Sequence, residues 1–272
     1  MKYRPDLHFV YPEQVDGHMI APELVFDEKI LSPEYPYYDR SFFFVFKQNL
    51  MHLLFLIFIV PVACVRFGLR IKGRNVFRKY HKLLKKGAIT VCNHVYEWDY
   101  LCVRAAIYPR KQYFTIWKNN LLRSLGPAFR TVGAVPIPSG NLAAIRSFER
   151  DVLKLLDEGR WLHFYPEGSM WYYEDKLRPF KKGVFSFAYR ANKPVIPLAI
   201  SYRPAKGICR LFKGKYPLCT ISIGEPLFPD YSLPKEEAVE KLRSEAEAAV
   251  AKQIDHYTAQ VNEKEQNHEQ KA

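Results

Sequence analysis

The sequence predicts an α/β fold: a mixed, largely parallel sheet covered by helices, preceded by a hydrophobic segment that anchors the chain to a membrane. Three observations support this prediction. Short apolar runs typical of buried strands alternate with segments of helical periodicity, as in parallel sheets. The chain has 272 residues and is 48% apolar, enough to form one sizeable core. One run, residues 50–65, is much more apolar than the rest.

The strands are predicted from short apolar segments that follow the anchor. Each is too short for a typical helix and rich in buried residue types. They cover residues 88–92, 113–117, 133–137, 161–165, 194–201 and 218–224.

Helices are predicted between and after these strands. Residues 141–159 have helical periodicity, with Ser139 available near the start and Gly159 at the end. Residues 185–191 are expected to form a second helix. From Val239 to Val261 apolar residues recur at helical spacing, so this tail is expected to pack back on the domain.

We therefore divide the chain into four parts, and it contains no internal repeat. The first is a polar arm with five prolines, which we expect to be extended and without a core of its own. The α/β domain is the third part, and the last combines an amphipathic helix with a polar tail. The four parts are residues 1–40 (arm), 41–70 (anchor), 71–232 (α/β domain) and 233–272 (helix and tail).

The hydrophobic segment at 50–65 predicts membrane association. As a helix it is about 24 Å long, short of the roughly 30 Å hydrocarbon core. Residues 42–46 would extend it, but Lys47, Gln48 and Asn49 interrupt the extension. We expect an anchor that enters one leaflet or marginally crosses. A buried core helix is the alternative.

Basic residues follow the anchor with no acidic residue among them. This pattern is typical of a cytoplasmic segment in contact with anionic lipid head groups, so the main domain is expected on the cytoplasmic face. A solvated basic face is the alternative. The residues are Arg66, Arg70, Lys72, Arg74, Arg78, Lys79, Lys82, Lys85 and Lys86.

The net charge of +13 also indicates an anionic partner. Nucleic acid is not expected, because the sequence has no zinc-ligand spacing and no RNA-binding aromatic motif. The five scattered cysteines (Cys64, Cys92, Cys102, Cys209 and Cys219) have no CxxC spacing and indicate reduced core residues. The N-terminus shows no signal peptide pattern.

A histidine and an aspartate, His94 and Asp99, lie five positions apart directly after the first predicted strand. If a helix begins near Asp99, its carboxylate can fold back onto the imidazole and fix its tautomer. The other ring nitrogen is then free to take a proton, which makes His94 a candidate general base. The alternative is a buried histidine beside a helix-capping aspartate.

Five segments, in this order and spacing, resemble the blocks of the glycerophospholipid acyltransferase family, often called PlsC-like. The resemblance extends over roughly residues 71–225 and implies that 71–232 is a catalytic domain. The segments are NHVYEWD (93–99), GAVPIPS (133–139), YPEGSMW (165–171), LRPFKKG (177–183) and KPVIPL (193–198).

The resemblance implies an O-acyltransferase that moves a fatty acyl group to a lysophospholipid hydroxyl. The acyl donor, acyl-CoA or acyl carrier protein, is then a substrate, and no cofactor or metal is expected. His94 is implied as the base and Asp99 as its orienting partner. Gly133, Glu167 and Gly168 are implied as substrate-binding residues, and Pro197 marks the fourth block.

The chemistry fits these residues independently, because a thioester needs only a base, oxyanion donors and positioning. A serine hydrolase is not favoured, since no Gly-x-Ser-x-Gly motif occurs. A thiol nucleophile at Cys92 is conceivable, but its apolar strand favours a core role. His163 is likewise expected to be packed in the core.

The acceptor is predicted less directly, because the chain departs from the family pattern. Tyr96 stands where the family usually has a small hydroxyl residue, and Ser139 and Met170 stand where it usually has arginine. The nearest candidates for binding a phosphate are Arg178, Lys181 and Lys182.

The commonest acceptor in this family is 1-acyl-sn-glycerol-3-phosphate, which would give phosphatidic acid. A lysolipid without a phosphate monoester is the first alternative. Two further alternatives are a non-catalytic lipid-binding protein and an acyl thioesterase.

Overall fold

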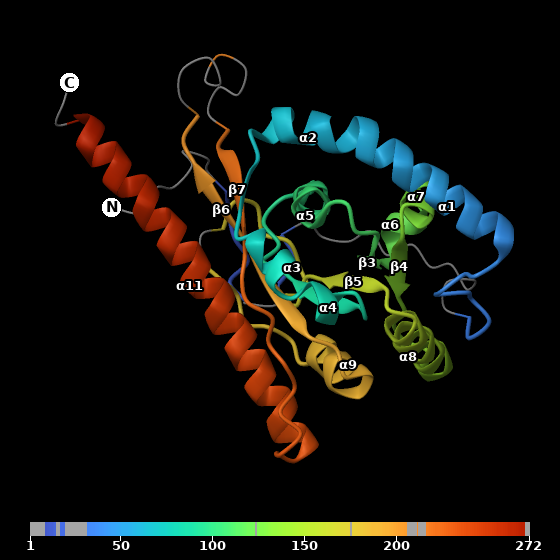
Figure 1. The fold of residues 1–272 in the computed structure, drawn as a ribbon. Helices are drawn as coiled ribbons and strands as arrows, with labels where there is room; N and C mark the ends of the chain where they lie inside the picture. Colours follow the sequence, from blue (N-terminus) through green and yellow to red (C-terminus); the bar gives the residue numbers. More distant parts are fainter. Residues whose placement is uncertain are drawn as a thin grey trace.

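The computed structural model describes residues 9–14, 17–19, 32–122, 124–174, 176–205, 211 and 216–269. Within these residues one seven-stranded sheet has the order β1-β7-β6-β2-β5-β3-β4 (Figure 1). Neighbouring strands are parallel except for β6 and β7, which confirms the prediction of a mixed, largely parallel sheet. The strands are β1 (Arg70–Lys72), β2 (Ala88–Val91), β3 (Gln112–Trp117), β4 (Ala134–Ile137), β5 (Trp161–Phe164), β6 (Val195–Arg203) and β7 (Leu218–Ile223).

Helices lie on both faces of the sheet (Figure 1). Those that the structure describes are α1 (Phe42–Leu54), the π-helical segment η1 (Phe55–Ile59), α2 (Val60–Phe67), α3 (Asn75–Lys79), α4 (His81–Leu84), α5 (Asp99–Ile107), α6 (Lys118–Leu122), α7 (Gly126–Thr131), α8 (Leu142–Asp157), α9 (Gly183–Ala191) and α11 (Lys235–Glu269).

Each face of the sheet carries its own apolar core. On one face α8, α9 and α11 pack on the strands, with Phe185 and Leu242 among the fully buried side chains. On the other face α3, α4 and α5 cover the strands, with Ile107 buried in that cluster. Because both faces are covered, all residues of β2 and β5 are buried, which explains why these strands appear as continuous apolar runs in the sequence.

The six predicted strands are confirmed, but β1 was not predicted. It lies inside the basic run, pairs with β7 at the edge of the sheet, and has only one side chain that is not exposed. A strand this short and polar has no alternating apolar pattern to reveal it. The cap of α8 also differs from the expectation: Asn141, not Ser139, accepts hydrogen bonds from the amides of Ala143 and Ala144.

The N-terminal arm takes part in the core of the α/β domain. Tyr37 is fully buried and Tyr38 nearly so, both in the cluster beneath α8. The Tyr38 hydroxyl donates to Glu158 at 2.6 Å. The arm thus has no core of its own but contributes to that of the domain. Residues 1–8, 15–16 and 20–31 of this part, and also Cys209, lie outside the described residues.

The anchor is one continuous helix from Phe42 to Phe67, formed by α1, η1 and α2. It is about 39 Å long at 1.5 Å per residue, and by length and composition it is long and apolar enough to cross a membrane. The helix continues through residues 47–49, whose polar side chains were expected to interrupt the apolar extension. The π-helical segment ends two residues before Pro61, whose missing N–H disturbs regular α-helical bonding.

Polar side chains of this helix bind the domain, which explains why they do not interrupt it. Gln48 is buried and accepts a hydrogen bond from the Tyr113 hydroxyl at 2.8 Å. Asn49 accepts from Lys111 at 2.8 Å, and the His52 ring contacts Arg104.

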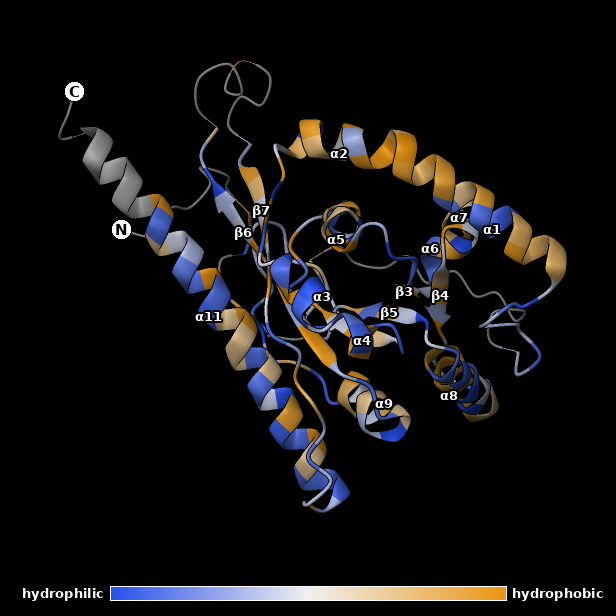
Figure 2. Ribbon diagram, viewed as in Figure 1, coloured by the Kyte–Doolittle hydropathy of each residue, from blue (hydrophilic) through white to orange (hydrophobic). Residues whose placement is uncertain are grey.

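The opposite side of the helix is apolar and exposed (Figure 2). Its members include Phe43, which is 78% exposed, Phe58 at 60% and Val65 at 82%. The helix lies along the surface of the domain and contacts it through α7 and α5 (Figure 1). The anchor is therefore amphipathic, with a polar side on the protein and an apolar side facing outwards.

Candidate active site

His94 and Glu167 lie at the same edge of the sheet. They follow β2 and β5, which are parallel neighbours paired from Ala88 with Trp161 to Val91 with Phe164. Parallel strands end at a common edge, and this edge is where open α/β sheets bind ligands. The topology thus brings together two sequence blocks that are about seventy residues apart.

Asn93 fixes the path of the chain as it leaves β2. Its side-chain amide donates to the Ile200 carbonyl at 3.0 Å, and its carbonyl oxygen accepts from the Ile200 amide at 2.8 Å. The side chain thereby ties the chain after β2 to β6, beyond the last backbone pair of these strands. This role was not predicted, although a buried polar residue directly after an apolar strand is the available signal.

His94 and Asp99 form a hydrogen-bonded pair. Nδ1 of His94 lies 3.2 Å from Oδ2 of Asp99. With the carboxylate ionised, Nδ1 carries the proton and donates it, so Nε2 is left as a free acceptor. The His94 side chain is 24% exposed and Asp99 only 3%, which leaves the imidazole accessible while its partner is enclosed.

Asp99 also holds the turn between β2 and α5. The same Oδ2 accepts from the amides of Val95 at 2.7 Å and Tyr96 at 2.8 Å. Burial raises the pKa of Asp99, while its bonds to His94 and to these amides oppose that rise. Asp99 therefore makes both of the contacts considered from the sequence: it pairs with His94, and it holds the turn that leads into α5.

Glu167 is a buried connector between three parts of the chain. Its carboxylate accepts from the His94 amide at 3.1 Å and from the Arg178 amide at 3.2 Å. It also forms an ion pair with the Arg178 guanidinium at 2.6 Å. Burial raises the pKa of Glu167, and the charge of Arg178 opposes that rise.

The guanidinium of Arg178 is enclosed within the protein. Only 5% of the residue is exposed, and besides Glu167 it contacts the hydroxyl and the carbonyl of Ser169. It also lies over the Trp171 ring, 4.7 Å from its centroid. Arg178 was predicted as a phosphate-binding residue, but in this structure its donors are directed to protein groups.

The loop after Glu167 is tied to the chain around His94. The Trp171 amide donates to the His94 carbonyl at 3.1 Å. Gly168 has a φ of +79°, in the left-handed region that favours glycine, so this position is a backbone requirement. The N-terminal arm covers the loop: the Gly17 carbonyl accepts from the Ser169 hydroxyl and from the Trp171 ring N–H.

The two lysines next to the loop differ. The side chain of Lys181 passes over Gly168, where its Nζ would lie 2.8 Å from a Cβ at that position. In the part of the chain that the structure describes, Lys181 makes no ion pair. Lys182 is paired with Glu240 at 2.9 Å, on the surface beside α11.

The second of the five sequence segments, residues 133–139, does not lie beside His94 and Asp99. Gly133 precedes β4, at the edge where the parallel strands begin, whereas His94 follows β2 at the opposite edge. Gly133 has a φ of +107° and forms the turn into β4. Ser139 lies at the same edge as His94, but β5 and β3 separate its strand from β2.

Two other reactive side chains are placed in the core, as predicted. Cys92 is fully buried, and burial together with the nearby Asp99 and Glu167 charges raises its pKa, which disfavours the thiolate. His163 is also fully buried, and its pKa is lowered to about 3 by burial and the nearby charge of His94.

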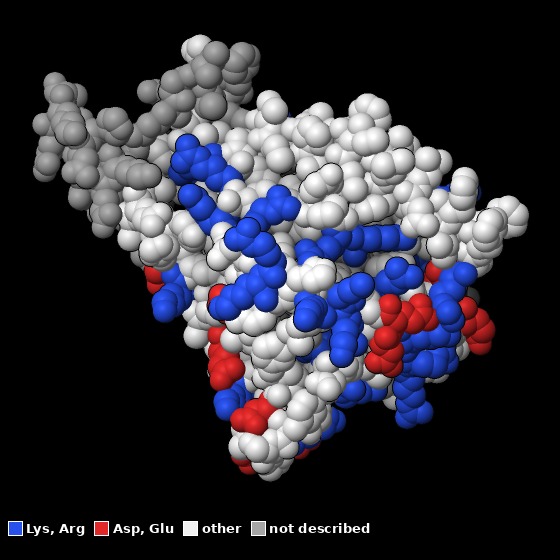
Figure 3. Space-filling view, viewed as in Figure 1, with Lys and Arg blue, Asp and Glu red and all other residues white. Residues whose placement is uncertain are grey.

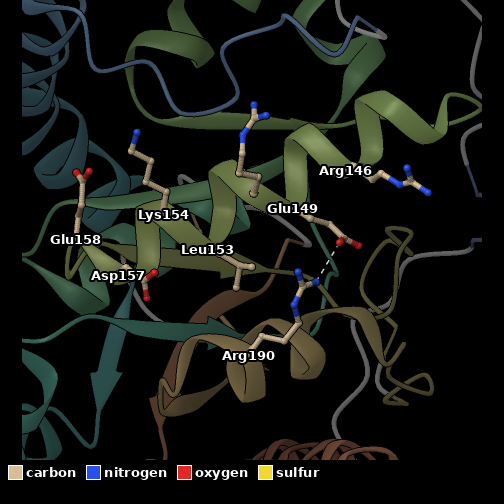
Figure 4. Close-up of a pocket in the computed structure, with 8 residues that line it drawn as sticks. Arg146, Glu149, Leu153, Lys154, Asp157, Glu158 and Arg190 are labelled. Carbon is tan, nitrogen blue, oxygen red and sulfur yellow. Dashed lines mark hydrogen bonds and ion pairs between the residues drawn. The ribbon is translucent and has the colours of Figure 1, made fainter.

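A pocket of about 640 Å³ lies elsewhere, between α8 and α9. Its lining mixes cations and anions, and Arg190 is paired with Glu149 at 3.0 Å (Figure 4). It contains none of the predicted site residues. Among the residues described, no group of three His, Cys, Asp or Glu side chains is arranged to hold a metal ion.

Comparisons with known proteins agree on the class of this domain. Residues 68–201 match the model of the family described as Acyltransferase. A comparison with curated protein sequences gives no match. Among solved structures, the chain resembles the 1-acyl-sn-glycerophosphate (LPA) acyltransferase PlsC from Thermotoga maritima. The TM-score is 0.53 at 21% identity, covering 80% of this chain and 88% of that chain.

At that identity the structural likeness shows the fold, and the family model adds the class of protein. The matched range of 68–201 contains all five sequence segments, with His94 and Glu167 among them. The chain therefore contains a domain that matches the acyltransferase family, and its fold resembles that of PlsC.

Proposed function

We propose that the protein transfers a fatty acyl group from an acyl thioester to a lysophospholipid hydroxyl, with His94 as general base. The supporting observation is the His94–Asp99 pair, in which Asp99 is enclosed and the imidazole remains accessible. Asp99 orients the ring and stabilises the imidazolium that forms when Nε2 takes the hydroxyl proton.

The reaction needs no acyl-enzyme intermediate. As Nε2 of His94 accepts the proton, the acceptor oxygen attacks the thioester carbonyl and forms a tetrahedral oxyanion. The carbon–sulfur bond then breaks, and the leaving thiolate takes the proton back from the imidazolium. The products are an ester and a free thiol, of coenzyme A or of acyl carrier protein. A base in this role contributes about 10²- to 10⁴-fold to the rate.

The proposed acceptor is 1-acyl-sn-glycerol-3-phosphate, which would give phosphatidic acid. Lys181 is the predicted cation best placed to bind its phosphate, because it is exposed and its side chain passes over Gly168. Lys182 lies in the same segment but is paired with Glu240. An ammonium binds phosphate as a point charge, with less geometric selection than an arginine fork.

The placement of Arg178 favours a second candidate acceptor. With its guanidinium directed to Glu167 and Ser169, the described site lacks an exposed arginine fork for a phosphate monoester at these positions. A lysolipid with a larger or zwitterionic head group would not need one. Met170 and Ser139, which replace the family's usual arginines, are consistent with this alternative.

We further propose that the exposed apolar side of α1, η1 and α2 enters one leaflet. The basic residues from Arg66 to Lys86 are exposed and gather over α3 and α4, beside the apolar surface of that helix (Figure 3). Such residues add about 1 kcal/mol each near an anionic surface. We therefore propose that the domain lies on the cytoplasmic face, where basic residues beside a membrane segment are typical.

Vesicle binding tests the membrane proposal. Phe58→Glu should weaken binding to anionic vesicles, whereas Leu142→Glu, at a residue 75% exposed on α8, should not. Salt should weaken binding without abolishing it, because the apolar contribution is not screened. Equal binding by both variants and the wild type would exclude this helix as the anchor.

Lipid mass spectrometry tests the reaction. The purified protein in vesicles is given acyl-CoA or acylated carrier protein together with a panel of lysolipids. We expect acylation by the wild type and none by His94→Ala, which should keep its fold and its vesicle binding. Wild-type turnover by His94→Ala would refute the proposed base. Free fatty acid without a lipid product would identify a thioesterase, and no turnover with any donor would indicate a lipid-binding protein.

A further inference from the structure

Tyr165 lies face to face with the proposed base. It is the residue directly after β5, and its ring centroid is 3.9 Å from that of the His94 imidazole, with 13° between the planes. The contact joins two adjacent parallel strands at their common edge. The Tyr165 hydroxyl is buried and has no hydrogen-bond partner among the described residues, so the ring, not the hydroxyl, makes the contact with the base.

A second histidine supports Tyr165 from within the sheet. His163 is two residues earlier on the same side of β5, and its ring meets that of Tyr165 edge to face at 4.4 Å and 90°. Its Nδ1 lies 2.8 Å from the Thr90 hydroxyl, which itself accepts from the Gln112 amide at 2.6 Å.

These bonds hold the His163 ring in place, and the ring is neutral. Burial and the charge of His94 lower the pKa of His163 to about 3, so this ring stays neutral near neutral pH. His163 therefore does not compete with His94 for the proton of the acceptor.

We infer that Tyr165 is a positioning residue for His94, a role that rests on the proposed function. Its ring holds the imidazole in the plane in which Nδ1 meets Asp99. The face of an aromatic ring also attracts a cation, so the ring stabilises the imidazolium formed as the hydroxyl proton is taken. Tyr165 thus raises the strength of the base without touching the substrate.

Other titratable groups also face the imidazole. They are Asp99 on α5, His163 on β5 and Glu167 after β5. A test of Tyr165 must leave these three unchanged, and the substitutions below alter only the stacked ring. Tyr165→Phe keeps the ring and removes only the unpaired hydroxyl. Tyr165→Leu and Tyr165→Met keep an apolar side chain but remove the ring.

The experiment measures kcat and KM for acyl transfer across pH 5–9 in the three variants and the wild type. Losing the ring should lower kcat about tenfold, as for loss of one cation–aromatic contact. It should leave KM for both substrates nearly unchanged. The acid limb of the kcat profile should move to lower pH, because a less stabilised imidazolium releases its proton more readily. Tyr165→Phe should retain the wild-type kcat and acid limb.

The outcomes separate this role from a structural one. Circular dichroism and vesicle binding check folding, and Tyr165→Met replaces Tyr165→Leu if the latter does not fold. A fall in kcat with an unmoved acid limb, or an equal loss in Tyr165→Phe, would overturn the positioning role. Failure of the proposed function would look different: His94→Ala would then be as active as the wild type.

Discussion

The two sides of the site differ in how firmly their side chains are held. On the side of the base, Asp99 and Glu167 are enclosed, and each accepts three hydrogen bonds from protein groups. On the side proposed for the acceptor, Lys181 and Lys182 are exposed, and Ser139 follows β4, which β5 and β3 separate from β2. The side proposed for proton transfer is therefore fixed by many bonds, whereas the side proposed for the acceptor presents a few exposed side chains.

This difference teaches which substitutions the site tolerates. A change on the enclosed side leaves a buried polar or charged group without its partner, and that costs stability as well as activity. A change on the exposed side alters the choice of acceptor and little else. Each prediction below tests this contrast.

The largest effect is expected from Arg178→Met. It leaves the Glu167 carboxylate buried without its cation, and removal of one partner of a buried ion pair typically costs about 3–5 kcal/mol. Urea unfolding in detergent should show this loss of unfolding free energy. Lys182→Met is the matched control, because it removes an exposed ion pair with Glu240 and should change stability far less.

A double variant sharpens the same test. Glu167→Gln combined with Arg178→Met removes both charges, so it should recover part of the stability lost in Arg178→Met. If Arg178→Met is as stable as Lys182→Met, the enclosed side is not held by this ion pair.

Asp99→Asn should have the next largest effect, on the rate. The asparagine oxygen can still accept from the Val95 and Tyr96 amides, so the turn should be kept. The imidazolium loses its counter-charge and the tautomer is no longer fixed, and kcat should fall about 10²-fold. Initial rates at saturating substrate check this. A wild-type kcat would show that Asp99 serves the turn alone.

A smaller effect is expected from Lys181→Ala. If the acceptor carries a phosphate monoester, its KM should rise about tenfold, the value of one lost charge-assisted contact, with kcat nearly unchanged. Lys182→Ala should change KM less, and Met170→Arg should not harm activity. Neutral results for Lys181→Ala, together with faster acylation of a zwitterionic lysolipid, would reassign the acceptor and leave the His94 mechanism in place.

The smallest effect concerns pH and stability. Burial raises the pKa of Asp99 in the folded protein above its value of about 3.9 in an unfolded chain. The folded state therefore binds this proton more tightly, and its contribution to stability is lost as pH rises through the folded pKa. Asp99→Asn cannot ionise, so its unfolding free energy should improve relative to the wild type as the pH rises above the unfolded-chain value of about 3.9. An unchanged difference would show that Asp99 has an unshifted pKa.

The sequence was sufficient to predict that His94 and Asp99 lie together. His94 and Asp99 are five residues apart, so a strand end and a helix start bring them together without any distant contact. The strands were predictable for a similar reason, because coverage of both faces leaves continuous apolar runs. The roles of His94 and Asp99 in catalysis remain predictions.

The contacts of Arg178 and Gln48 were not predictable in the same way. Both side chains are polar and lie in segments that suggest exposure, and their partners come from distant parts of the chain. A phosphate-binding arginine and a buried ion-paired arginine have the same local sequence. Only the three-dimensional structure distinguishes them, because it brings Arg178 back to Glu167, which itself bonds to the His94 amide.

The polar contacts of the anchor helix with Tyr113, Lys111 and Arg104 also bear on how substrates arrive. They bind the helix within about one turn, to residues of α5 and β3 and of the segment between them. The contacts of α1 with α7 and of α2 with α5 hold it on either side of that turn. A helix held in this way cannot swing about one end, so a leaflet that covers its apolar side meets the domain in a single orientation. If the apolar side of this helix enters the leaflet as proposed, the height of His94 above the lipid surface is constant, and we expect an acceptor to be selected first by how far its hydroxyl projects from the bilayer.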